Sequence, residues 1–486
     1  MQTRQNGHVL TAGPQRTATP NAQPGEARLR WVSARLAVES FAARAAARLS
    51  RLAGAGGGTT LPGKLLWKLD PGAIDALAAR LPQGTAVVSA TNGKTTTTAM
   101  VAKILEHHTR LAWNSSGANL VSGIASTLLA RRDAELGLLE VDEAALPEIA
   151  KRVRPRALLL GNLFRDQLDR YGELEHVADR WRQTVERLPP GAALVVNGDD
   201  PQVGDLARGR PGAIAFGVDD RRHARESLQH AADSRYCVRC GHPYEFAAAY
   251  VGHLGDYYCP SCGHQRPELD VVARAIELNG LESAAFDLVT PGGATRIELP
   301  LPGLYNVYNA LGAAALAQVL GASLEEIRAG LERFGAAFGR FERITSGDKT
   351  ILLLLIKNPA GANEAVRTLE QGGAPSLVLI ALNDGIADGK DVSWIWDIDL
   401  EPLLAGTQRL IASGDRAAEL GVRCVYGGLD EAALEVEPDL RRALDRGLEL
   451  TPAGGELVIL PTYTAMLALQ RILSERGLAK PYWERS

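Results

Sequence analysis

Long hydrophobic runs, a secretory signal and a strong excess of one charge are all absent from this sequence. None of its apolar stretches approaches the roughly 20 residues that a membrane-spanning helix needs. The formal net charge of −4 gives no basis for non-specific binding to nucleic acid. The N-terminus lacks the basic-then-apolar order of a secretory signal. We therefore expect a cytoplasmic protein, and its 486 residues predict two or three domains.

Cysteine is scarce, but its spacing is informative. Four of the five cysteines form two Cys-x-x-Cys pairs, which favours a metal site in a reducing compartment over a disulfide framework. The spacing is typical of a zinc ribbon, in which four thiolates close the coordination sphere of a structural zinc ion. A nucleic-acid-binding ribbon is the alternative, although few basic residues lie within the cysteine loop. The predicted zinc ligands are Cys237, Cys240, Cys259 and Cys262.

Histidine is absent after His264. A glutaminase of class I needs a cysteine nucleophile with a histidine base. The remaining cysteine, Cys424, lies in the part of the chain that has no histidine. We therefore predict that Cys424 is a strand thiol in the core and that this chain is not its own glutaminase.

The pattern of apolar runs predicts an α/β protein. Residues 1–27 are polar and are expected to form a disordered tail. An amphipathic helix predicted at 28–53 is expected to pack on the main body, with a membrane-surface helix as the alternative. Strands and helices then alternate, so that 28–336 is predicted to form a domain with a parallel sheet and helices on both faces. Polar sequence with the cysteine pairs interrupts it at about 222–266. A smaller, doubly wound α/β domain is predicted at 337–486.

The stretch "SATNGKTTTT" follows a predicted buried strand and opens a helix. Backbone N–H groups of such a loop bind phosphate oxygens, a lysine reaches the terminal phosphates and a hydroxyl binds Mg²⁺. Gly93, Lys94 and Thr95 supply this core, whereas Val88 stands where the full pattern has its first glycine. The alternative is a helix N-terminus that is merely rich in threonine. The predicted ATP-binding residues are Thr91, Asn92, Gly93, Lys94, Thr95 and Thr96.

A second predicted strand ends in "LLEVDEAAL", with Glu140, Asp142 and Glu143 near its carboxyl end. Acidic groups at a strand end beside a phosphate loop are well placed to hold Mg²⁺. A solvated acidic loop is the alternative. The pattern favours Glu140 as a magnesium ligand.

These motifs together resemble those of the Mur ligases and folylpolyglutamate synthetases. "ATNGKTT" is similar to their Gly-Thr-Asn-Gly-Lys-Thr-Thr, with Ala90 in the place of glycine. Glu140 matches the metal-binding glutamate of Mur ligases, and "NLFRDQLDRYGELE" resembles their Asp-His-Leu-Asp segment, with Gln167 replacing a metal-associated histidine. The resemblance implies a central P-loop ATPase domain that uses ATP and Mg²⁺. It places Lys94 and Glu140 in catalysis, and Thr95 and Glu140 on the magnesium ion.

The resemblance extends to the nucleotide site. "GLYNVYNALGAAA" is similar to a family motif whose asparagines, here Asn306 and Asn309, would lie near adenine. Arg340 in "FGRFER" resembles the arginine of the linker between the family's domains, which would approach the nucleotide when the domains close. Lys357 and Asn358 in "LIKNPAG" stand near the place of a family aspartate or histidine.

Two departures from the Mur ligase pattern narrow the choice among members of the family. The carbamylated lysine of several Mur ligases is missing, because no lysine lies between Lys151 and Lys349. Too little sequence precedes the phosphate loop for the usual UDP-sugar domain. This short lead and the cysteine insertion resemble the MurT family, as do "GGGTTLPG", "ADGKDVSWIWD" and "LPTYTAM". That resemblance implies amidation of the D-glutamate α-carboxylate of lipid II through an acyl phosphate, at the inner face of the membrane.

The same resemblance implies a partner, a GatD-type class I glutaminase that supplies ammonia. An acidic residue of this chain would complete the partner's catalytic triad. We place that role on Asp391, with Asp397 as second choice. Trp394 and Trp396 suit an interface, because aromatic anchors are enriched there. The alternative is a helix cap beside core tryptophans.

Two other functions are compatible with the sequence. A stand-alone amino-acid ligase of the folylpolyglutamate synthetase type would need no glutaminase. A nucleotide-gated scaffold would bind partners without catalysis, but the intact set of Lys94, Thr95 and Glu140 argues against it.

Overall fold

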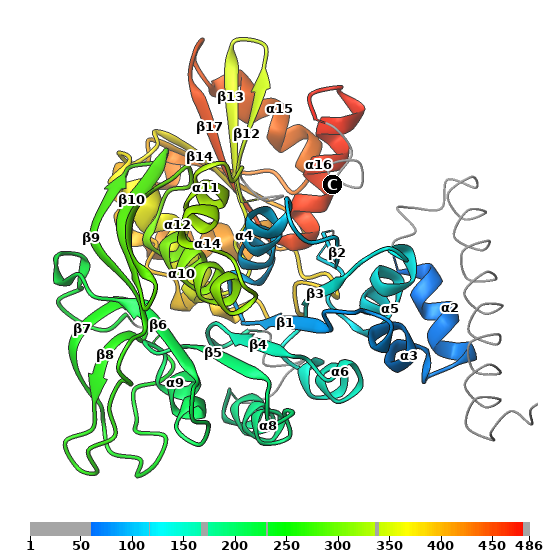
Figure 1. Cartoon of the computed structure of the whole chain (residues 1–486). Coiled ribbons are helices and arrows are strands. Elements are labelled where there is room, and N and C mark those ends of the chain that lie inside the picture. The colour runs from blue at the N-terminus through cyan, green and yellow to red at the C-terminus, as the bar shows by residue number, and fades with distance from the viewer. Residues whose placement is uncertain (1–59, 116, 167–173, 230–231, 336–339, 480–486) are drawn as a thin grey trace, which may run out of the picture.

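The computed structural model describes residues 60–115, 117–166, 174–229, 232–335 and 340–479. Its strands form two separate α/β sheets and one small hairpin (Figure 1). The predicted tail and the amphipathic helix that follows it lie outside the described residues, and so does Gln167. No helix of the described part is long and apolar enough to cross a bilayer.

The first sheet has nine strands in the order β11-β10-β9-β6-β5-β4-β1-β3-β2. Its strands from β9 to β2 run parallel, as the alternation of strands and helices predicts, whereas β10 is antiparallel to both of its neighbours, β9 and β11. The strands are β1 (Thr85–Ser89), β2 (Leu111–Trp113), β3 (Leu136–Glu140), β4 (Ala157–Leu160), β5 (Ala193–Asn197), β6 (Ile214–Val218), β9 (Val271–Asn279), β10 (Ser283–Thr290) and β11 (Gly293–Leu299).

Helices cover both faces of this sheet, and the central strands β1, β3 and β4 are accordingly buried at every position. In β1, Ala86 and Val88 belong to the core on one face, and Val87 belongs to the core on the other. The first face carries α4, α10 and α11, and the second carries α3, α5, α6 and α8. The helices are α2 (Leu61–Leu69), α3 (Ala73–Ala79), α4 (Lys94–Leu105), α5 (Val121–Ala130), α6 (Leu146–Val153), α8 (Leu174–Glu186), α9 (Pro201–Ala207), α10 (Leu304–Val319) and α11 (Leu324–Glu332).

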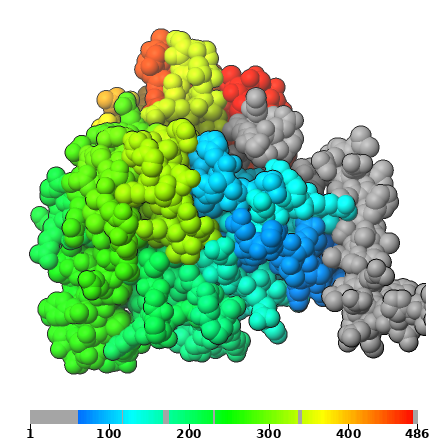
Figure 2. All heavy atoms as spheres, viewed as in Figure 1, coloured from blue at the N-terminus to red at the C-terminus, as the bar shows by residue number. Residues whose placement is uncertain are grey.

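The cysteine-containing insertion lies between β6 and β9. Its hairpin consists of β7 (Glu245–Val251) and β8 (Leu254–Tyr258), preceded by the short helix η1 (Arg221–His223). The hairpin is tied to the large sheet, since Gly255 N donates to the backbone carbonyl of Asp199 at 2.8 Å. In the space-filling view it lies at the opposite end of this unit from α2 and α3 (Figure 2).

The second sheet has six strands in the order β12-β13-β17-β14-β15-β16. It is parallel except for the edge strand β12, so the predicted doubly wound unit is present with one antiparallel edge. Its strands are β12 (Arg340–Ser346), β13 (Lys349–Leu354), β14 (Leu377–Ala381), β15 (Arg409–Ser413), β16 (Leu434–Val436) and β17 (Glu456–Pro461). Its helices are α12 (Pro359–Gln371), η2 (Ser393–Asp397), α13 (Glu401–Gly406), α14 (Ala417–Tyr426), η3 (Glu431–Ala433), α15 (Leu440–Leu450) and α16 (Tyr463–Glu475).

The alanine that replaces a family glycine fits because of a neighbouring glycine. Ala90 follows β1 and is 3% exposed, and Gly161 follows β4, the adjacent parallel strand. Gly161 N donates to Ser89 O at 2.9 Å, which holds the two strand ends together. A Cβ built on Gly161 would lie 2.8 Å from the Ala90 Cβ, closer than real Cβ contacts. The methyl group of Ala90 therefore fills the space that Gly161 leaves.

This complementarity predicts a coupled pair of substitutions. Gly161→Ala should lower the free energy of unfolding by about 1–3 kcal/mol, since it overpacks the contact with Ala90. The same change in an Ala90→Gly background should cost clearly less. Denaturant unfolding of the two single variants and the double variant measures the coupling energy. Additive effects would contradict the steric explanation.

Candidate functional site

The phosphate loop joins β1 to α4 and packs against α10. Gly93 has φ +85° at the N-terminus of α4, a conformation that favours glycine. A Cβ at this position would also lie 2.0 Å from Asn309 Oδ1. Asn309 in turn receives a hydrogen bond from Thr97 Oγ1 at 3.4 Å and donates to Asn306 Oδ1 at 3.1 Å. Both asparagines of the α10 motif therefore lie on the side of the phosphate loop that faces α10. Asn309 contacts the loop, and Asn306 orients the side chain of Asn309.

Lys94 is buried within the loop. Its Nζ donates to the carbonyl of Ala90 at 2.5 Å and to the carboxylate of Glu143 at 2.7 Å. Burial acts to lower the pKa of Lys94, but the attraction of Glu143 and Asp142 outweighs it, so the pKa is raised above its usual value. The lysine is therefore fully charged at neutral pH. The sequence grouped Glu143 with the acidic residues that could hold Mg²⁺ and did not predict its contact with Lys94, because that contact joins residues at two different strand ends.

Glu140 and Thr95 lie together, as a magnesium site requires. Thr95 Oγ1 donates to Glu140 Oε1 at 3.1 Å, and Asn119 Nδ2 donates to the same oxygen at 3.1 Å. Asn114 fixes the backbone of Glu140 from both sides, at 2.9 Å and 2.8 Å. A hydroxyl and a carboxylate oxygen at this separation fit two ligands of one Mg²⁺, which prefers oxygen.

The other residues predicted to bind ATP have different surroundings. Thr91 is buried and donates through Oγ1 to the carbonyl of Phe164 at 3.3 Å, so it anchors the strand ends. Thr96 is buried, and its hydroxyl has no partner among the described residues. The backbone of Arg340 begins β12, and its side chain lies outside the described part.

The second unit closes over the phosphate loop. The side-chain amides of Asn92 and Asn358 exchange two hydrogen bonds, at 3.3 Å and 3.0 Å. Asn358 also caps α12 by accepting a hydrogen bond from Gly361 N at 2.9 Å. Beside it, Lys357 Nζ donates to Asp166 Oδ2 at 2.5 Å. The N-terminus of α12 is thereby held against the loop of the first unit.

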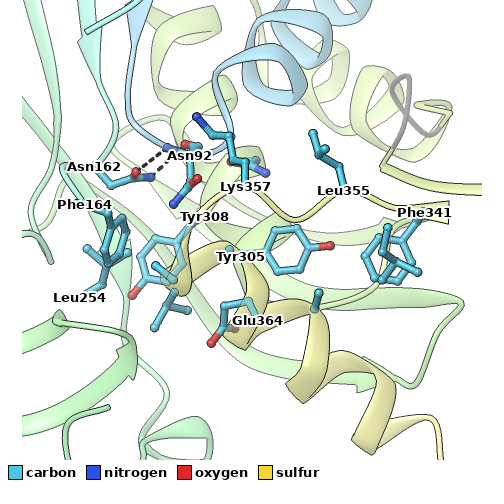
Figure 3. Close-up of a pocket in the computed structure, with 17 residues that line it drawn as sticks. Asn92, Asn162, Phe164, Leu254, Tyr305, Tyr308, Phe341, Leu355, Lys357 and Glu364 are labelled. Atoms are coloured by element: carbon cyan, nitrogen blue, oxygen red, sulfur yellow. Dashed lines mark hydrogen bonds between the residues drawn. The ribbon is translucent and has the colours of Figure 1, made fainter. Parts of the chain in front are cut away.

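A pocket of about 80 Å³ lies under this contact and takes residues from both units (Figure 3). Asn92, which Asn162 holds through two hydrogen bonds, marks its polar end. Tyr305 and Phe341 face each other at the other end, with ring centroids 6.2 Å apart and an interplanar angle of 27°. Phe341 has φ +54°, which is rare for a bulky side chain. The remaining named lining residues are Gly93, Phe164, Val251, Leu254, Tyr308, Asn309, Leu354, Leu355, Lys357, Ala360, Gly361, Glu364 and Ala365.

A buried charged cluster joins the insertion to the second unit at this pocket. Arg225 Nη2 donates to Glu364 Oε1 at 3.3 Å, and Arg367 Nη1 donates to the carbonyl of Tyr250 in β7 at 2.8 Å. Burial raises the pKa of Glu364 in spite of the two arginines. The insertion therefore packs on α12 as well as on the large sheet.

The four cysteines of the insertion converge. Their sulfur atoms all lie within 4.8 Å of one another, and two pairs are 3.5 Å apart. Burial alone would raise the pKa of the Cys237 thiol, but hydrogen bonds from the backbone N–H groups of Arg239 and Cys240 lower it to about 6. Four thiols so arranged fit a tetrahedral zinc ion. Cys424, by contrast, is fully buried in the core of the second unit, and burial raises its pKa to about 12. This confirms the prediction of a core thiol, but the predicted strand is wrong, because Cys424 lies in helix α14.

The segment around η2 presents one carboxylate and one tryptophan to solvent. Asp391 is exposed and accepts a hydrogen bond from Ser393 N at 2.8 Å, and hydrogen bonds from the side chain and the backbone of Ser393 lower its pKa. Trp396 is 51% exposed and meets Tyr426 edge-on at 5.8 Å. Trp394 packs against the core instead, so only one of the two tryptophans suits an interface. Asp397 forms an ion pair with Arg165 of the first unit at 3.6 Å.

Comparisons with known proteins agree with this geometry. Residues 88–257 match the family described as Mur ligase middle domain, and 355–466 match MurT ligase C-terminal. The chain is 34% identical over 439 residues to the lipid II isoglutaminyl synthase (glutamine-hydrolyzing) subunit MurT of Streptococcus pneumoniae, covering 89% of this chain and 95% of that protein. The subunit of the same name from Staphylococcus aureus N315 is 31% identical over 429 residues, with 87% and 94% covered.

Among solved structures, a pseudomurein peptide ligase type C from Methanothermus fervidus has a similar fold. The TM-score is 0.65 at 21% identity, and the match covers 83% of this chain and 80% of that one. At this identity the likeness shows the fold alone.

The cysteine cluster predicts a tightly held zinc ion. Elemental analysis of the purified chain should give about one zinc per molecule, and Cys240→Ser should lose it and lower the melting temperature, since metal binding is coupled to folding. Cys424→Ala is the matched control and should keep the zinc. Equal zinc content in both variants would contradict the assignment.

Proposed function

Since the chain belongs to the MurT family of Mur ligase-like proteins, we propose that it amidates the D-glutamate α-carboxylate of the lipid II stem peptide. The product is D-isoglutamine, ATP is the energy source, and a GatD-type glutaminase subunit supplies the ammonia. The reaction takes place at the cytoplasmic face of the membrane, where the substrate is anchored. The relatives in this family are named as glutamine-hydrolyzing synthase subunits, which supports both the reaction and the partner.

The observation that carries this proposal is the convergence of Lys94, Thr95 and Glu140 under the second unit. A carboxylate is a poor electrophile, and transfer of the γ-phosphoryl group of ATP to its oxygen supplies a leaving group. Charge develops on the transferring group, and the charged Lys94 is positioned to stabilise it. Mg²⁺, when bound at Thr95 and Glu140, would neutralise charge on the phosphates.

The pocket beside the loop supports nucleotide binding. Its flat, apolar end between Tyr305 and Phe341 suits a purine ring, and its polar end borders Gly93 of the phosphate loop. Asn309 lines the same pocket and offers both a donor and an acceptor. A nucleotide could therefore place its base in the pocket and its phosphates at the N-terminus of α4.

The surface around Asp391 supports the role of the partner. An exposed carboxylate with a lowered pKa can orient a histidine of a second subunit and stabilise its charged form. Trp396 and Tyr426, both exposed, are aromatic anchors on the same unit. Asp397 is already paired with Arg165, which favours Asp391 for the role in the triad. A stand-alone amino-acid ligase would have no use for such a surface.

Lys94→Ala should reduce ATP-dependent amidation by at least about 100-fold, because it removes the charge that stabilises the transferring phosphoryl group. Mass spectrometry of lipid II after incubation with ATP, Mg²⁺ and ammonium measures the exchange of OH for NH₂. The fold and the zinc content should be unchanged. Normal amidation by the variant would refute the role of the loop.

Asp391→Asn should reduce glutamine-dependent amidation by about 100-fold or more and leave ammonium-dependent amidation within a few-fold of wild type. The matched control is Asp397→Asn, which should keep both activities. The reverse pattern would move the triad role to Asp397, and equal loss of both activities in Asp391→Asn would place that residue in the fold or the ligase site.

A further inference from the structure

The loop that follows β4 holds a buried carboxylate with an unused oxygen. Asp166 is 7% exposed, and its Oδ2 accepts a hydrogen bond from Lys357 Nζ at 2.5 Å. Its Oδ1 is buried and has no hydrogen-bond partner among the described residues. A buried carboxylate oxygen without a donor is costly, and native proteins rarely keep one without a function.

Asp166 is held firmly in this position. Three consecutive backbone N–H groups before it donate to buried side chains: Leu163 to Asp200 at 2.8 Å, Phe164 to Thr91 at 3.1 Å and Arg165 to Asp233 at 2.9 Å. The ion pair with Lys357 fixes one carboxylate oxygen from the other unit. The orphan oxygen is therefore a consequence of a rigid loop.

Asp166 has the pocket on one side and the segment next to the proposed glutaminase surface on the other. On one side, Lys357 lines the pocket and precedes Asn358, which is bonded to Asn92 of the phosphate loop (Figure 3). On the other side, the neighbouring Arg165 is paired with Asp397, in the segment next to the proposed glutaminase surface. Asp166 thus lies between the surface that would deliver ammonia and the loop where the acyl phosphate would form.

We propose that Asp166 receives ammonia and acts as the proton acceptor of the amidation step, an inference that rests on the proposed function. The nitrogen is held by Asp166 Oδ1 while it attacks the acyl carbon. The N–C bond forms, the C–O bond to the phosphate breaks, and its electron pair leaves with the phosphate. The surplus proton on the nitrogen passes to Asp166 Oδ1. Lys357, on the other oxygen, keeps the carboxylate in place.

Chemistry favours a carboxylate for this task. Ammonia becomes positively charged as it attacks, so a negative group beside it stabilises the developing charge and then takes the proton. Neither Lys94 nor Lys357 can accept this proton while charged. Asp142 and Glu143 lie beside Lys94 of the phosphate loop, and Glu143 accepts a hydrogen bond from Lys94 Nζ. Glu364 lines the pocket from the second unit, but it is paired with Arg225. Asp166, on the first unit, contacts the pocket residue Lys357 and keeps one oxygen without a donor among the described residues.

The test compares two nitrogen nucleophiles on the full chain with lipid II, ATP and Mg²⁺. Ammonia needs a proton acceptor, whereas hydroxylamine is a stronger nucleophile whose adduct loses its proton to water readily. Asp166→Asn should lower the yield of isoglutamine from ammonium by about 100-fold or more. It should leave the yield of the lipid II hydroxamate from hydroxylamine within a few-fold of wild type. Mass spectrometry distinguishes the two products.

The matched control is Asp233→Asn, which removes a carboxylate that holds the same loop through Arg165 and does not meet Lys357. Its ratio of amide to hydroxamate should equal that of wild type, and this ratio does not depend on the fraction of folded protein. Equal loss of both products in Asp166→Asn would overturn the proposal, and so would retention of both. Absence of hydroxamate with the wild-type chain would instead refute the proposed amidation, and with it any role of Asp166 in that step.

Discussion

The reciprocal amide pair between Asn92 and Asn358 is the contact on which the site depends. It joins the phosphate loop of the first unit to the cap of α12 in the second. Because Asn358 uses the same side chain to cap α12, the direction of that helix is fixed by the loop. This contact also sets the positions of Lys357 and of the pocket walls that the second unit supplies. Without it, the pocket would lack the side that the second unit provides.

The closed arrangement is held largely by hydrogen bonds and ion pairs that are individually weak, and this suits a ligase that must open. Neutral hydrogen bonds contribute about 1 kcal/mol each to stability. The half-exposed ion pair between Arg165 and Asp397 contributes less than its geometry suggests. The cluster of Arg225, Glu364 and Arg367 adds a second attachment through the insertion. The zinc-ribbon-like hairpin, far from the reacting atoms in sequence, thus acts as a support for the second unit. Domain closure and opening in such enzymes commonly accompany each turnover.

Local spacing revealed some parts of the site and could not reveal others. The phosphate loop and the cysteine pairs were predictable, because their ligands are neighbours in the sequence, and Glu140 was predictable as a strand end. The contacts of Lys94 with Glu143 and of Lys357 with Asp166 join distant segments, and no periodicity encodes them. Alternation of strands and helices predicted parallel sheets but not their antiparallel edges at β10, β11 and β12, since apolar spacing is the same in both.

The linker strand β12 contains a residue with a strained backbone conformation. Phe341 lies at φ +54° within a register shift of β12, and left-handed backbone costs a non-glycine residue on the order of 1–2 kcal/mol. That energy is stored while its ring faces Tyr305 across the pocket. Relaxation of Phe341 would release this energy, which corresponds to about a tenfold shift in an equilibrium. If the linker relaxes when the two units separate, the strain favours opening and so speeds release of whatever the pocket holds.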